Sequence, residues 1–213
     1  CGDADGAVTG NTRRFGASLD KIKQVVDVRD GEIMFGLNMV VHKGKTIFVG
    51  DTSVHEYPTS EQMAEMAIST ARVVRLFGFD PKVAFVSHST FGQPLTSRTK
   101  HIRNAVDILK EKKVDFEFDG DMQPDVALNP EYKDLYPFSK IVGKANILIM
   151  PGQHSAAISY KMMKTLGDTK VIGPLLIGLG LPIEIAPLRS STSELINLAS
   201  IAAYSADVID YKK

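Results

Sequence analysis

Short apolar segments alternate with longer amphipathic segments along most of this 213-residue chain. Residues 82–87 (KVAFVS) and 145–151 (ANILIMP) are apolar and include β-branched side chains, as buried strands do. Residues 58–78, by contrast, place apolar side chains on one face of a helix. Strands that alternate with helices of this length form a mainly parallel sheet flanked by helices. The sequence therefore predicts an α/β fold.

A hairpin and a capped helix are the most sharply marked local elements. Residues 33–41 and 46–50 indicate two strands that turn at Gly44. Thr59 and Gln62 form a capping box at the start of the next helix, and Gly78 ends it. A further strand is expected at 115–120 (DFEFDG). Three more helices are expected from apolar positions at helical spacing: Ile102, Ala105, Val106 and Leu109; Ile158, Met162 and Leu166; and Leu195, Leu198, Ala199 and Ala202.

Residues 171–188 (VIGPLLIGLGLPIEIAPL) are almost wholly apolar and raise the question of a membrane span. The segment contains Pro174, Pro182, Pro187 and Glu184. A spanning helix needs about 20 apolar residues and tolerates such helix breakers poorly. We therefore expect two short buried strands here and no membrane association.

The charge balance and the single cysteine exclude several classes of protein. Lysine and arginine together number 25, as do aspartate and glutamate, so the formal net charge is zero. No field of one sign recruits nucleic acid or an anionic membrane, and neither is expected as a partner. Because Cys1 is the only cysteine, an internal disulfide is impossible and a cysteine-based metal site is disfavoured. This cysteine usage fits the reducing cytoplasm, which is the expected location.

Ligands of parallel α/β sheets bind at the carboxyl ends of the strands. The loop at 87–94 (SHSTFGQP) carries Ser89, Thr90 and Gly92, and hydroxyls and glycine amides of this kind bind phosphate. An ordinary polar loop is the alternative, since the chain has neither a G-x-x-x-x-G-K-[ST] nor a G-x-G-x-x-G motif. The loop at 151–155 adds Ser155 as a further ligand-binding candidate.

Residues 119–125 (DGDMQPD) contain Asp119, Asp121 and Asp125. Three carboxylates this close bind magnesium in some proteins, but aspartates in such clusters more often bond to nearby amides in turns. The five histidines are scattered, and none forms an H-x-x-x-H pair. We therefore expect no metal site and keep Asp125 as a ligand-binding candidate.

Two further polar turns lie near the ends of the chain. Residues 10–18 (GNTRRFGAS) carry Arg13 and Arg14, and paired arginines suit an anion, although a solvated turn is the equal alternative. Residues 187–194 (PLRSSTSE) combine hydroxyls, a guanidinium and a carboxylate. Ser191 and Glu194 match the S-x-x-E capping box before an apolar helical run. Such a cap contributes on the order of 1 kcal/mol to helix stability and requires no catalytic function.

Six segments, in this order and spacing, resemble the phosphotransacetylase family: GDADGAVTG, STFGQP, VDFEFDGDMQPDVALN, YPFSKIVGKANILIMP, HSAAISYKM and VIGPLLIGL. The resemblance covers essentially the whole chain. Through the STFG loop and the HSA-x-IS segment, it is closer to the phosphotransacetylase-like C-terminal region of large bacterial NADP-dependent malic enzymes. It implies a two-lobed α/β fold related to isocitrate dehydrogenases. Residues 27–180 then form the second lobe, and the flanking segments 1–26 and 181–213 belong toward the first lobe.

The resemblance also implies a regulatory function. The chain is then a region that binds acetyl-CoA or coenzyme A, holds no cofactor of its own, and forms homo-oligomers that are at least dimers. A malic enzyme domain absent here carries out the oxidative decarboxylation of malate to pyruvate. That domain uses NADP and a divalent metal, Mg or Mn.

The alternative is an active phosphate acetyl- or butyryltransferase, which moves an acyl group between acyl phosphate and coenzyme A. In active members of the family, the turn equivalent to 187–194 resembles S-R-G-C-S-x-x-D. Its Asp deprotonates the thiol of coenzyme A, and its Ser and Arg assist acetyl phosphate. Here Pro187 and Leu188 stand at the Ser and Arg positions, and Glu194 stands at the Asp. The resemblance therefore implies lost transferase activity, with Glu194 and the displaced Arg189 as the remaining catalytic candidates.

Overall fold

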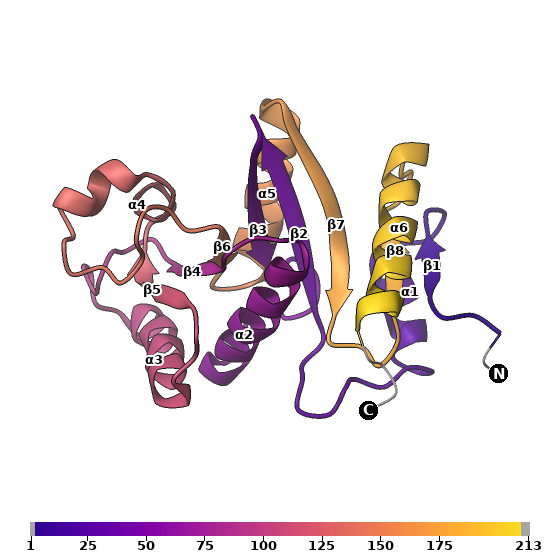
Figure 1. The fold of residues 1–213 in the computed structure, drawn as a ribbon, viewed down its shortest axis with the longest axis horizontal. Coiled ribbons are helices and arrows are strands. Elements are labelled where there is room, and N and C mark those ends of the chain that lie inside the picture. Colours follow the sequence, from indigo (N-terminus) through magenta and orange to yellow (C-terminus); the bar gives the residue numbers. More distant parts are fainter. Residues whose placement is uncertain (1–2, 210–213) are drawn as a thin grey trace.

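A computed structural model of the protein describes residues 3–209, so Cys1, Gly2 and residues 210–213 lie outside the described part. Within it the chain forms eight strands, six α-helices and one 3-10 helix (Figure 1). The strands are β1 (Ala7–Gly10), β2 (Phe35–His42), β3 (Lys45–Gly50), β4 (Lys82–Val86), β5 (Glu117–Met122), β6 (Ile147–Ile149), β7 (Thr169–Ile177) and β8 (Ile183–Ala186). The helices are α1 (Phe15–Ile22), α2 (Ser60–Leu76), α3 (Ser97–Lys112), α4 (Pro124–Leu128), η1 (Pro130–Asp134), α5 (Gln153–Leu166) and α6 (Thr192–Val208).

Six strands form one central sheet in the order β5-β4-β6-β3-β2-β7. Strands β5, β4, β6 and β3 are parallel, whereas β2 runs antiparallel to both β3 and β7. The antiparallel part arises because β2 and β3 are joined by a two-residue turn, in which Lys43 and Gly44 have φ values of 47° and 74°. The predicted hairpin at Gly44 and the mostly parallel sheet are both confirmed.

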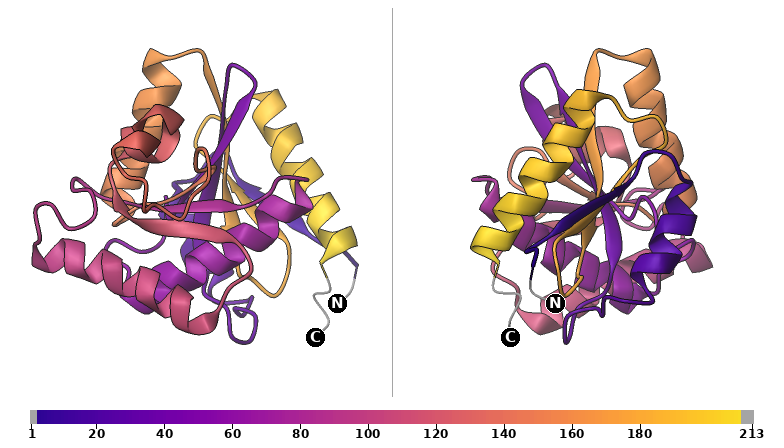
Figure 2. Two further views of the ribbon diagram at one scale, coloured as in Figure 1. Left: turned by 60° about the vertical axis from the view of Figure 1, so that its left-hand side comes forward. Right: turned by 90° about the vertical axis from the view of Figure 1, so that its right-hand side faces the viewer.

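Helices cover both faces of the central sheet (Figures 1 and 2). Helices α2, α3 and α6 pack on one face, over a core that includes Phe48 and Phe85. Helices α4 and α5 pack on the other face, over Val49 and Ala84. Successive residues of a strand point to opposite faces, which explains why neighbours such as Ala84 and Phe85 belong to different layers.

A second, smaller sheet is made from the two ends of the chain. Strand β1 pairs in parallel with β8, from Ala7 opposite Ile183 to Gly10 opposite Ala186. Helix α1 packs against this region through Leu19, which belongs to a third apolar cluster together with residues of β7 and β8. Helix α6 lies along the same part of the molecule (Figure 2). The division of the chain into lobes at 27–180 stays a prediction.

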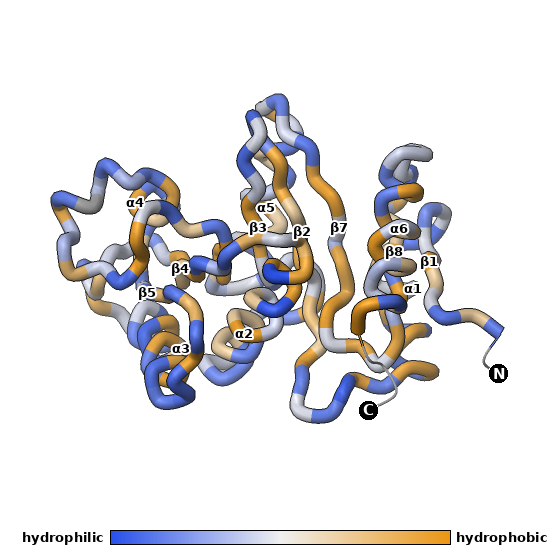
Figure 3. The backbone as a smooth tube through the Cα atoms, viewed as in Figure 1, coloured by the Kyte–Doolittle hydropathy of each residue, from blue (hydrophilic) through white to orange (hydrophobic). Residues whose placement is uncertain are grey.

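The apolar segment at 171–188 folds into most of β7 and all of β8, as predicted. Figure 3 shows apolar residues along most of β7, which is the last strand of the central sheet. Val171, Leu175, Leu176 and Ile185 are all buried. In the part of the chain that the structure describes, no helix has the length and apolar character needed to cross a membrane.

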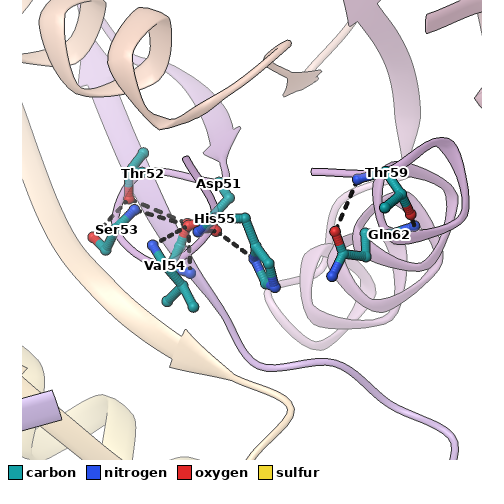
Figure 4. Close-up of polar contacts among 8 residues, drawn as sticks. Asp51, Thr52, Ser53, Val54, His55, Thr59 and Gln62 are labelled. Carbon is teal, nitrogen blue, oxygen red and sulfur yellow. Dashed lines mark hydrogen bonds and ion pairs between the residues drawn. The ribbon is translucent and has the colours of Figure 1, made fainter. Parts of the chain in front are cut away.

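The predicted start of α2 and the predicted buried face of α3 are confirmed, whereas the predicted buried face of α5 is wrong. The capping box of Thr59 and Gln62 is confirmed, with N–H···O distances of 2.8 and 3.2 Å (Figure 4). The apolar positions of α3 are buried as expected. Helix α5 differs: its periodic residues are 58%, 54% and 82% exposed at Ile158, Met162 and Leu166. The helix instead packs on the sheet through Ala156, Tyr160 and Met163, which occupy another face of it.

Candidate functional site

Loops from four parallel strands meet at one edge of the central sheet, because the carboxyl ends of parallel strands share an edge. These loops follow β3, β4, β5 and β6. The candidates Ser89, Thr90, Gly92, Asp125 and Ser155 all lie in these loops or in the first turn of the next helix. All the ligand-binding candidates predicted to follow these strands therefore lie at one edge of the sheet.

Asp121 ties the loop after β4 to β5. Its buried carboxylate accepts hydrogen bonds from the hydroxyl of Ser89 and from the backbone N–H of Gly92, the latter at 3.1 Å. The hydroxyl of Thr90 accepts from the backbone N–H of Gln123 at 3.3 Å. Ser89 and Thr90 are 0% and 7% exposed, so these hydroxyls bond inside the protein. Ser89, Thr90 and Gly92 thus fix the shape of the loop.

Asp51 organises the loop after β3 in the same way (Figure 4). Its carboxylate is 0% exposed and accepts from the backbone N–H groups of Gly36, Ser53, Val54 and His55 at 2.9, 2.8, 3.1 and 2.7 Å. The Nδ1 atom of the His55 ring lies 2.8 Å from the same carboxylate. Hydrogen bonds to a carboxylate compensate its buried charge. The loop is therefore held by a buried anion whose donors come mainly from the backbone.

The loop after β3 also contacts the first turn of α5, the helix that follows β6. Nε2 of His154 lies 3.3 Å from the Glu56 carboxylate, and the His154 ring stacks with Tyr57 at a centroid distance of 6.5 Å. Arg98, at the start of α3, lies over the Tyr57 ring at 5.2 Å from its centroid. A cavity of about 290 Å³ borders Tyr57, Arg98 and Pro151. An aromatic ring and a guanidinium thus line the sheet edge where ligands bind in this fold class.

Ser155 and the predicted aspartates mainly satisfy backbone groups. The Ser155 hydroxyl donates to the carbonyl of Gly152 at 2.8 Å. Asp119 accepts from the N–H of Lys140 at 2.8 Å, and the exposed Asp125 accepts from its neighbour Val126 at 3.0 Å. Turn chemistry, rather than metal binding, explains these contacts. Within residues 3–209, no group of three or more His, Cys, Asp or Glu side chains is placed to hold a metal ion.

The candidate arginines lie in two adjacent turns at the end of the small sheet. Arg13 and Arg14 follow β1, and Arg189 follows β8 with a φ of 61°; all three are exposed. The N–H of Asn11 donates to the carbonyl of Ala186, and the N–H of Arg189 donates to the carbonyl of Asn11, both at 3.0 Å. The fold therefore brings together guanidinium-bearing residues from opposite ends of the sequence. This end of the small sheet carries the charge that an anion requires.

The turn at 187–194 is organised as a helix start. The Ser190 hydroxyl donates to the Pro187 carbonyl at 2.8 Å. The Glu194 carboxylate accepts from the Ser191 N–H at 2.8 Å, while the Ser191 hydroxyl accepts from the Glu194 N–H at 3.3 Å. The capping box predicted for this turn is confirmed.

Glu194 is also paired with a residue from another helix. The Lys164 ammonium group, near the end of α5, lies 2.8 Å from the Glu194 carboxylate. The bond from Lys164, together with that from the Ser191 N–H, lowers the pKa of Glu194 to about 2. A general base works best with a pKa near the operating pH. Glu194 in this arrangement is therefore a weak base.

Sequence reasoning misses Asp51, Tyr57 and Lys164. Asp51 directly follows a predicted strand. Because ligands in such sheets bind at the carboxyl ends of strands, this position indicates a candidate site residue. Tyr57 lies in the same loop. Lys164 carries no local signal, because its partner Glu194 lies on a different helix that only the fold brings near.

The fold and this edge define an α/β protein whose candidate binding loops follow parallel strands. Residues 1–203 match the family model described as phosphate acetyl/butaryl transferase, and the chain belongs to that family. The predicted relation to phosphotransacetylases is thereby confirmed.

Individual relatives fall into two groups. The NADP-dependent malic enzyme of Rhizobium meliloti (strain 1021) is 45% identical over 205 residues, which cover 96% of this chain and 27% of that protein. The phosphate acetyltransferase of Bacillus subtilis (strain 168) is 30% identical, over 96% of this chain and 64% of that protein. A solved phosphotransacetylase from Streptococcus pyogenes has a TM-score of 0.90 at 30% identity, covering 96% and 63% of the two chains. The chain thus spans only part of each.

The ion pair of Glu194 makes a testable contribution to stability. Because the pKa of Glu194 falls from its ordinary 4.5 to about 2, the folded state binds fewer protons than the unfolded state between these values. The stabilisation is therefore present above about pH 4.5 and is lost as the pH falls toward 2. We expect Glu194→Gln to lower stability near neutral pH by about 0.5–1 kcal/mol, because solvent screens this pair. The difference from wild type should shrink on acidification.

Urea denaturation at a series of pH values measures this difference. Glu111→Gln is the matched control, since Glu111 is an exposed helical residue that loses the same charge. A Glu194→Gln effect that is equal at every pH, or equal to that of Glu111→Gln, would show that the ion pair contributes nothing.

Proposed function

We propose that this chain is the regulatory, acetyl-CoA-binding region of an NADP-dependent malic enzyme and has lost transferase activity of its own. The observation that carries the proposal is the contact of Lys164 with Glu194. It engages the carboxylate at the family's general-base position in an ion pair. Pro187 and Leu188 stand where active members have Ser and Arg. Each positioned donor lost from such a site costs roughly 3 kcal/mol of transition-state stabilisation.

The likeness to malic enzymes supports the proposed parent protein. The aligned part is 27% of the Rhizobium meliloti enzyme, and in this proposal NADP, malate and Mg or Mn bind to the remaining part of the parent protein. Acetyl-CoA bound here acts on that part by linkage: an effector that prefers one quaternary state shifts the distant site between its states.

The two turns that carry arginine supply the chemistry that coenzyme A phosphates need. Arg13, Arg14 and Arg189 are exposed and lie in adjacent turns, and guanidinium groups bind phosphate through two parallel hydrogen bonds.

The loop after β4 is already fixed by the contacts of Asp121. A preformed loop loses little entropy when a ligand binds.

A second candidate function is phosphate acyl transfer, as in the phosphate acetyltransferase relative. Arg189 is exposed in the turn that also carries Glu194, and the two residues supply a guanidinium and a carboxylate. In this alternative they form a relocated catalytic pair. The length of the parent gene separates the two: a malic enzyme adds several hundred residues, whereas a transferase adds about one lobe.

Acetyl-CoA binding is expected for the complete protein. The double variant Arg13→Ala/Arg14→Ala should weaken binding at least about tenfold, because charge-assisted hydrogen bonds contribute about 1.5–3 kcal/mol each. Titration calorimetry measures the affinity. Lys110→Ala/Lys112→Ala is the control, since it removes equal charge from the far end of α3. Absence of binding at millimolar acetyl-CoA would contradict the regulatory proposal.

A homodimer or larger assembly is expected, with the exposed face of α5 at the contact. Ile158, Met162 and Leu166 are all more than half exposed, and exposed apolar patches mark interaction surfaces. Light scattering at tens of micromolar should show at least a dimer, and Met162→Asp should shift it toward monomer. Asn104→Asp adds the same charge at an exposed position of α3 and should have no effect. A wild-type monomer would contradict the expectation.

Transfer between acetyl phosphate and coenzyme A is expected to be negligible in the complete protein. Losing two positioned donors removes roughly 5 kcal/mol or more, a rate factor of at least about several thousand. Thioester formation measures the activity, with Arg189→Ala and Glu194→Gln as test variants. Turnover above about 1 per second that both substitutions abolish would establish the transferase function instead, since such rates are ordinary for enzymes.

A further inference from the structure

A buried carboxyl group lines a mainly apolar cavity of about 410 Å³ between α2, α6 and the carboxyl-terminal half of β7. The apolar lining includes Val73, Leu175, Ile177 and Ile201. The volume falls within the range of about 300–1,000 Å³ that small-molecule sites occupy. None of the candidate ligand-binding or catalytic residues described above belongs to the lining, so the cavity is distinct from the candidate site.

The carboxyl group belongs to Glu184 of β8. It is 4% exposed and accepts a hydrogen bond from the backbone N–H of Leu176 on β7 at 3.0 Å. Burial raises the pKa of Glu184 to about 8, so the group is mainly protonated at pH 7. A protonated carboxyl group carries an O–H donor. Glu184 can therefore donate a hydrogen bond to an oxygen atom of a ligand in the cavity.

A hydrogen bond joins the two helices on either side of the cavity. The hydroxyl of Tyr204 on α6 donates to the carbonyl of Leu76, the last residue of α2, at 3.1 Å. Both residues belong to the lining. A molecule in the cavity thus contacts two helices that are already linked to each other.

The arginines of the lining are engaged with carboxylates. Arg29 and Arg72 lie 3.4 and 3.0 Å from the Glu32 carboxylate, and Arg75 lies 3.0 Å from that of Asp115. A ligand carboxylate would have to compete with these ion pairs, and a ligand cation would lie among guanidinium groups of the same sign. An apolar space also disfavours any charge that lacks a partner. The lining therefore favours a neutral ligand.

We propose that this cavity binds a neutral, mainly apolar molecule whose carbonyl oxygen accepts a hydrogen bond from Glu184. The apolar body lies between α2 and α6. A medium-chain ketone or ester has this chemistry. An apolar pocket that contains one buried titratable group is a pattern typical of binding sites. The proposal goes beyond the regulatory function and does not depend on acetyl-CoA binding.

The test is a calorimetric titration of the complete protein with 2-octanone, with and without acetyl-CoA. We expect saturable binding of the ketone in both cases. Octanoate and octylammonium have similar apolar chains but carry a charge, and each should bind at least about tenfold more weakly. Their affinities test the predicted preference for a neutral molecule without any change to the protein.

A variant that fills the cavity tests where the ketone binds. Ser205→Trp places a large ring in the lining and should weaken binding at least about tenfold, because the apolar body loses its space. Ser193→Trp is the matched control, since it adds the same ring to the exposed first turn of α6 and should have no effect.

A pH series tests the hydrogen bond from Glu184 even if Ser205→Trp does not fold. As the pH rises through about 8, Glu184 ionises and loses its O–H donor. The affinity for 2-octanone should therefore fall about fivefold or more between about pH 7 and pH 9.

Glu184→Gln separates this effect from the other charged and titratable groups of the lining. These are Arg29 and Glu32 before β2, Arg72 and Arg75 on α2, and Tyr204 on α6. Glutamine keeps an N–H donor for the ketone and an oxygen acceptor for the Leu176 N–H, but it does not ionise. The variant should bind 2-octanone within about twofold of wild type at pH 7 and show no pH dependence.

Four outcomes would overturn the proposal. These are no saturable binding of 2-octanone to the complete protein, binding of octanoate or octylammonium as tight as that of the ketone, unchanged affinity in a folded Ser205→Trp variant, and a pH dependence that Glu184→Gln leaves intact. Binding of the ketone without any binding of acetyl-CoA would support this proposal and contradict the regulatory one.

Discussion

The parallel pairing of β1 with β8 is the contact on which the rest of the candidate chemistry depends. It joins opposite ends of the sequence through four residue pairs, beginning with Ala7 opposite Ile183. A two-stranded parallel sheet is weak alone and needs helices on its faces, and α1 and α6 both contact it. The pairing sets the Arg189 turn beside Arg13 and Arg14. It also starts α6 where Glu194 meets Lys164, and the same helix contacts the end of α2 through the hydrogen bond from the Tyr204 hydroxyl to the Leu76 carbonyl.

Buried carboxylates hold the loops in place, just as the pairing of β1 with β8 holds the two ends of the chain together. Asp51 and Asp121 are both 0% exposed, and each accepts from backbone amides of a loop at the carboxyl edge of the sheet. Removing such an acceptor leaves buried N–H groups without partners, which costs about 1–3 kcal/mol for each. The loops therefore keep one shape without a ligand. Rigid loops suit a binding region, because little entropy remains to be lost.

Local chemistry was readable from the sequence, and long-range contacts were not. The capping boxes at Thr59 and Ser191 each need only a residue three positions on, and both form. The hairpin at Gly44 and the order of strands and helices follow equally short patterns. The apolar residues at helical spacing from Ile158 lie on the exposed face of α5, because the helix packs on the sheet through Ala156 and Tyr160 instead. The hydroxyl of Ser89 is directed by Asp121, which is distant in sequence and invisible to any local motif.

The contacts of Glu194 show why family membership alone does not assign an activity to this chain. A general base must exchange a proton with its substrate, and that requires a pKa within reach of the working pH. The Lys164 ammonium and the Ser191 N–H both stabilise the ionised form, and together they hold the pKa of Glu194 at about 2. The same contacts fix the start of α6 against the end of α5. One carboxylate cannot serve both purposes well, since each gain in ionic bonding lowers its basicity. In this structure the Glu194 carboxylate caps the start of α6 and links that helix to α5 through its ion pair with Lys164.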